Sequence, residues 1–76
     1  MKKRIRIEDR GQDVLWFVVN GEGMIVDAGP FQASFWCGNY IPSEMLRIGE
    51  PCPMYMPRFI YKGHLIYKVE SIEEMT

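Results

Sequence analysis

The sequence predicts one small antiparallel β domain over residues 1–76, with its sheet curled into a partly open barrel or roll. Three observations support this. Short apolar segments have the patterns of strands, turn residues separate them, and no segment has the length of a stable helix. With 47% hydrophobic residues and a net charge of −1, the chain also has the composition of a folded protein. The expected shape is SH3-like or OB-like, and such folds host many unrelated functions.

The first two strands follow from the hydrophobic pattern. Residues 3–8 alternate strictly, which places Ile5 and Ile7 on one face of a half-buried strand. Residues 14–19 are apolar on both faces and rich in β-branched and aromatic side chains, as in a strand with a neighbour on each side. Both segments are therefore expected inside the sheet.

A hairpin should follow the second strand. Asn20-Gly21 is typical of a type I′ turn, whose two central residues need positive φ, and Gly23 allows a longer loop instead. Residues 24–28 should then pair back on the second strand. Gly29-Pro30 ends that third strand.

A fourth strand is predicted over residues 32–37. Alternation places Phe35 on one face with two small apolar neighbours, and Trp36 on the other face with a serine. We therefore expect Phe35 in the core and Trp36 at the surface. One short helical turn near 43–47, capped by Ser43, is the only helix expected.

The last third of the chain is predicted to hold an edge segment and a hairpin. Pro51, Pro53 and Pro57 remove backbone donors, so residues 52–56 fit only an edge strand or an extended loop. A three-residue turn at 62–64 would then place a set of apolar side chains on one inward face. That set is Phe59, Tyr61, Leu65, Tyr67 and Val69.

The sequence does not contain a complete catalytic or metal-binding set. Cys37 and Cys52 are far apart in the chain, and His64 is the single histidine, so the close ligand pairs typical of zinc sites are missing. Cys37 lies on the predicted face of Phe35, where a small apolar side chain packs well. We expect no metal, no cofactor and no enzymatic activity.

The chain is expected to be cytoplasmic and to have no membrane segment. Its longest apolar run, residues 14–19, is far shorter than the ~20 residues that span a bilayer. Lys2, Lys3 and Arg4 resemble the start of a signal peptide, but charged residues follow where its apolar region should lie.

The leading functional hypothesis is a non-enzymatic protein-interaction module that binds another protein or a second copy of itself. Aromatic residues make up 13% of the chain, more large rings than so small a core is expected to enclose. Tryptophan and tyrosine are frequent anchors of protein interfaces. The expected partner-binding patch consists of Phe31, Trp36 and Tyr40.

The alternative hypothesis is a small barrel that binds nucleic acid. Aromatic side chains beside basic ones bind single strands by stacking and by neutralising phosphates. This requires the two ends of the chain to form one basic face, made of Lys2, Lys3, Arg4, Arg6, Arg58, Lys62 and Lys68, with His64 beside them. The pI of about 5.7 argues against it, because dedicated binders usually carry a clearly basic domain.

Overall fold

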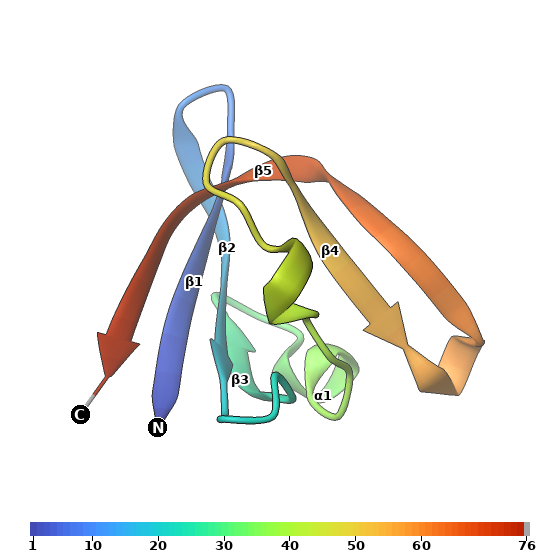
Figure 1. The fold of residues 1–76 in the computed structure, drawn as a ribbon. Coiled ribbons are helices and arrows are strands. Elements are labelled where there is room, and N and C mark those ends of the chain that lie inside the picture. The colour runs from blue at the N-terminus through green and yellow to red at the C-terminus, as the bar shows by residue number, and fades with distance from the viewer. Residues whose placement is uncertain (76) are drawn as a thin grey trace.

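The computed structural model describes residues 1–75 and has the predicted antiparallel β architecture (Figure 1). One five-stranded sheet, with strand order β3-β2-β1-β5-β4, curls into a half-barrel. Its strands are β1 (Lys2–Asp9), β2 (Gln12–Val19), β3 (Ile25–Gly29), β4 (Pro51–Met56) and β5 (Tyr61–Met75). The connections contain one helical turn, α1 (Ala33–Trp36), and two 3-10 turns, η1 (Ser43–Met45) and η2 (Pro57–Phe59). No helix within residues 1–75 is long and apolar enough to cross a membrane.

The pairing of β1 with β2 confirms the predicted inward face. Ile5 lies opposite Phe17, and Ile7 lies opposite Leu15. Ile5, Ile7 and Phe17 are almost completely buried. Strict alternation produces this result because successive side chains of a strand point to opposite faces.

The β2–β3 hairpin has the longer loop that Gly23 allows. The side-chain oxygen of Asn20 accepts hydrogen bonds from the backbone N–H of Glu22 (2.9 Å) and of Met24 (3.0 Å). These bonds hold the loop in a compact shape. Glu22 lies at its exposed tip.

β5 connects the two halves of the curled sheet. Its C-terminal half pairs with β1 and its N-terminal half pairs with β4, and Figure 1 shows the strand arching over the top of the fold between them. β4 is the edge strand that its prolines predict, because β5 is its only strand neighbour in the sheet.

The predicted hairpin turn at 62–64 is wrong. The chain instead reverses at η2, and Lys62 to His64 belong to the continuous strand β5. Phe59 and Tyr61 are 51% and 43% exposed, so their inward assignment is also wrong. Val69 is buried, and Leu65 and Tyr67 pack against the core as predicted.

The predicted fourth strand at 32–37 is also wrong, because residues 33–36 form α1. Ala33, Trp36 and Cys37 pack against the core, and this i, i+3, i+4 spacing is that of one helix face. Phe35 is 44% exposed, whereas Trp36 is half-buried with its ring edge-to-face against Phe17 at 5.2 Å. The expected orientations of Phe35 and Trp36 are therefore reversed.

Residues 38–41, here called the bridging segment, join the two edges of the half-barrel. Tyr40 exchanges backbone hydrogen bonds with Tyr55 of β4, both 2.8 Å long. On the other side, the N–H of Ile25 donates to the carbonyl of Asn39 (2.7 Å), and that of Ile41 donates to Gly23 (2.9 Å). The short predicted helical turn follows this segment as η1.

Candidate functional site

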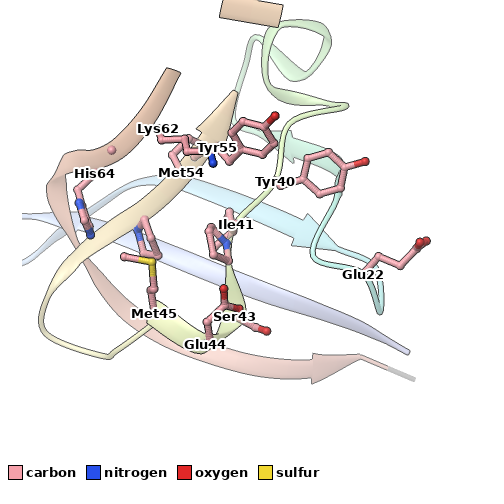
Figure 2. Close-up of a pocket in the computed structure, with 13 residues that line it drawn as sticks. Glu22, Tyr40, Ile41, Ser43, Glu44, Met45, Met54, Tyr55, Lys62 and His64 are labelled. Carbon is pink, nitrogen blue, oxygen red and sulfur yellow. The ribbon is translucent and has the colours of Figure 1, made fainter. Parts of the chain in front are cut away.

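A groove of about 720 Å³ lies between residues 40–45 and the paired ends of β4 and β5 (Figure 2). Its size falls within the roughly 300–1,000 Å³ of typical ligand sites. Its floor and walls combine apolar, aromatic and charged side chains. The lining residues are Glu22, Tyr40, Ile41, Pro42, Ser43, Glu44, Met45, Pro53, Met54, Tyr55, Lys62, Gly63 and His64.

Two stacked tyrosines form the aromatic part of the groove. The rings of Tyr40 and Tyr55 have centroids 6.1 Å apart and an interplanar angle of 29°. Their backbone hydrogen bonds fix this arrangement, because the bridging segment and β4 meet at these two residues. The ammonium of Lys62 lies 5.2 Å from the centre of the Tyr55 ring, within the range of a cation–π contact.

The basic residues of the groove come from one face of β5. Lys62 lies opposite Tyr55, and His64 lies opposite Pro53. Two residues separate successive positions on one face of a strand, so Lys62 and His64 point to the same side. Both are exposed.

The acidic residues of the groove come from two other elements. Glu22 belongs to the β2–β3 loop and Glu44 to η1, and both are exposed. Figure 2 shows Lys62 and His64 on one side, Glu22 on the far side beyond Tyr40, and Glu44 beside Ser43 on the lower wall. The groove therefore carries opposite charges at its two ends.

The structure separates the three residues of the predicted partner-binding patch. Tyr40 lines the groove. Phe31 is 64% exposed but is not part of the groove lining. Trp36 packs inward against Phe17, so the surface exposure expected for it is wrong.

The structure also separates the residues of the predicted basic face. Lys3 pairs with Glu74 at 3.8 Å, and Arg6 pairs with Asp13 at 3.5 Å. Arg4 lies 5.3 Å over the ring of Trp16.

The other members of that face have different surroundings. Lys2 lies opposite Met75, and Lys68 lies opposite Glu8. Arg58 lies 5.8 Å from the ring of Phe59, at the turn between β4 and β5. Of the seven residues, Lys62 is the one that lines the groove.

The cysteines and the histidine do not form a common site. Cys37 and Cys52 are both free thiols. Burial raises the pKa of the Cys52 thiol to about 12, so it is protonated at neutral pH and is a poor nucleophile. Within residues 1–75 no three His, Cys, Asp or Glu side chains lie close enough together to hold a metal ion.

Most of the groove was not predicted from the sequence. Tyr40 and Tyr55 are far apart in the chain, and no local pattern indicates that they meet. The alternate spacing of Lys62 and His64 was the available signal, because it places both on one face of any strand. The chain matches no protein-family model, no curated protein and no solved structure.

Proposed function

We propose that this protein is a non-enzymatic interaction module that binds an extended segment of a partner protein in the groove. The observation that carries the proposal is the pair of stacked rings of Tyr40 and Tyr55 in an open groove with exposed charges at both ends. Aromatic-lined grooves are a recurring means of binding extended peptides, and tyrosines are frequent hot spots of such interfaces.

The charges of the groove favour a protein over a nucleic acid. A phosphate backbone would be attracted to Lys62 but repelled by Glu22 and Glu44 at the other positions of the same groove. The cations of β1 do not add to this surface, because Lys3 and Arg6 already pair with carboxylates. A peptide carries side chains of both signs and so fits both ends.

The backbone arrangement favours side-chain contacts over the addition of a partner strand. Tyr55 already uses its N–H and carbonyl to bind Tyr40. Pro51 and Pro53 of the same strand have no N–H to donate. A partner segment therefore finds few free backbone groups along β4, and recognition depends on the side chains that line the groove.

The proposal includes the cytoplasm as the place of action. Both cysteines are free thiols, as is usual where glutathione and thioredoxin keep thiols reduced.

A display library of random twelve-residue peptides tests the proposal directly (the length is about that of a short linear motif). Selected peptides are titrated into isotope-labelled protein, and their binding site is mapped by amide chemical shifts. We expect the largest shifts at Tyr40, Tyr55, Lys62 and His64. Lys62→Ala should weaken binding about three- to fivefold, whereas Lys2→Ala, outside the groove, should leave it unchanged.

Three outcomes would contradict the proposal. Selected peptides would shift residues outside the groove, or an oligothymidine strand would bind the groove more tightly than any peptide. The third outcome is a concentration-dependent dimer, seen by sedimentation, that buries the groove and is broken by Lys62→Ala. That result would make a second copy of the chain the occupant.

A further inference from the structure

The two ends of the groove differ in charge, and the charges are not neutralised by neighbours. Lys62 and His64 lie at the end formed by β5, and Glu22 lies at the end formed by the β2–β3 loop (Figure 2). Within residues 1–75 neither Lys62 nor Glu22 forms an ion pair. All three side chains are exposed, so they are free to contact a ligand.

Rigid backbone elements hold these two ends apart. Lys62 is fixed by its pairing opposite Tyr55 in the β4–β5 ladder. Glu22 is held in a loop whose backbone donates two hydrogen bonds to the side chain of Asn20. The bridging segment connects the two elements through Tyr40, which pairs with both Met24 and Tyr55.

The middle of the groove is suited to an apolar side chain. The rings of Tyr40 and Tyr55 provide one wall, and Met45 of η1, which is 50% exposed, provides the opposite one (Figure 2). Methionine adapts its shape to different apolar partners, and a tyrosine ring offers a large apolar surface at low entropic cost.

We infer that the groove fixes the direction of its ligand. The segment that it binds carries an acidic side chain at the Lys62–His64 end, an apolar residue over Tyr40 and Tyr55, and a basic side chain at the Glu22 end. This inference rests on the proposed function and specifies its ligand. Like charges at either end would repel the reversed arrangement, so the same groove discriminates between the two.

The test uses four blocked synthetic peptides that share a central Pro-Leu-Pro-Leu segment. One carries two aspartates before this segment and two lysines after it. The second has lysines at both ends, the third has aspartates at both ends, and the fourth has asparagine and glutamine in place of the charges. We expect the first peptide to bind about threefold or more tighter than each of the others at low salt, and the difference to disappear at high salt.

Charge-reversal variants then test the direction. Lys62→Glu and Glu22→Lys should each weaken binding of the peptide with opposite charges. The double variant should restore it, because the peptide then binds the other way round. Lys2→Glu combined with Glu50→Lys makes the same charge changes at exposed sites outside the groove lining, and should have no effect.

A spin label on the acidic end of the peptide reports the orientation itself. In the unmodified protein it should broaden the amide signals near Lys62 and His64, and in the double variant those near Glu22. If peptides bind the groove equally well whatever their charges, or if the double variant does not restore binding, the inference is wrong although the proposed function stands. If no peptide from the set or the library binds the groove, the proposed function fails.

Discussion

The two halves of the curled sheet use their charged and aromatic side chains differently. On β1 and the strands beside it, Lys3 and Arg6 pair with carboxylates, and the apolar residues of the inner face are buried. On the β4–β5 half, Arg58 and Lys62 lie over aromatic rings, and Phe59 stays half exposed. The first half is thus organised to stabilise the fold. The second half leaves recognition groups available at the surface.

A matched pair of phenylalanines gives the largest expected difference between the halves. Phe17→Ala removes a completely buried ring that contacts Trp36, and should lower the free energy of unfolding by about 3–5 kcal/mol. Phe59→Ala removes a half-exposed ring and should cost less than about 1 kcal/mol. Urea titrations of both variants measure the difference. Equal losses would show that the turn between β4 and β5 is part of the core.

A pair of glycines tests the bridging segment that joins the halves. Gly11 and Gly23 both have φ of +83°, but a Cβ on Gly11 meets nothing, whereas one on Gly23 meets the carbonyl oxygen of Ile41 at 2.9 Å. Gly11→Ala should therefore cost about 1 kcal/mol for the backbone conformation alone. Gly23→Ala should cost about 2 kcal/mol or more and should speed hydrogen exchange at the Tyr40 and Tyr55 amides. Unchanged exchange there would show that Gly23 does not maintain the bridge.

A pair of lysines compares the two uses of charge. Lys3→Ala breaks an exposed ion pair and should lower the free energy of unfolding by no more than about 0.5 kcal/mol, and only at low salt. Lys62→Ala should leave stability unchanged and weaken peptide binding in the groove. Thermal melts at two salt concentrations and peptide titrations measure these effects. A stability loss confined to Lys62→Ala would reverse the assignment of the two halves.

Glu70 is the point where charge compensation in the first half is incomplete. A side-chain hydrogen bond with Asp13, followed by partial desolvation and the nearby Asp13 charge, raises the pKa of this exposed carboxyl. Because the folded state holds the proton more tightly than the unfolded state, the contribution of Glu70 to stability is lost as pH rises through the folded-state pKa. Glu70→Gln should therefore gain stability relative to the parent as pH rises through that acidic range.

Denaturant titrations across the acidic range measure this small effect. Glu50→Gln, at another exposed glutamate, controls for the change in net charge. A parallel pH profile for Glu70→Gln and the parent protein would rule out the Asp13 interaction as its cause.

The faces of β5 show why some predictions survive a wrong turn. Residues 61 and 65 share a face in a three-residue hairpin, and they also share a face in an uninterrupted strand, because an even number of positions separates them. The pattern therefore predicted the inward faces of Leu65, Tyr67 and Val69 but gave no information on where the chain reverses. Sequence patterns of period two report which face a residue takes and leave the partner strand undetermined.

The segment at 32–37 shows the opposite failure. Its spacing of Ala33, Trp36 and Cys37 is a helix pattern, but over so few residues a strand pattern fits as well. Contact between Trp36 and Phe17 accompanies the helical choice, and Phe17 belongs to another element. A single turn of helix is unstable alone, so its formation depends on tertiary packing.

The sequence by itself determined the β class, the inward face of β1, the β2–β3 hairpin and the edge position of β4. Each follows from alternation, turn residues or missing backbone donors, which act within a few neighbouring residues. Tertiary structure alone decided that Tyr40 joins Met24 and Tyr55, that Lys62 faces Tyr55, and that the β1 cations meet carboxylates. These contacts join residues distant in the chain, and they form only when the sheet curls and brings its edges together.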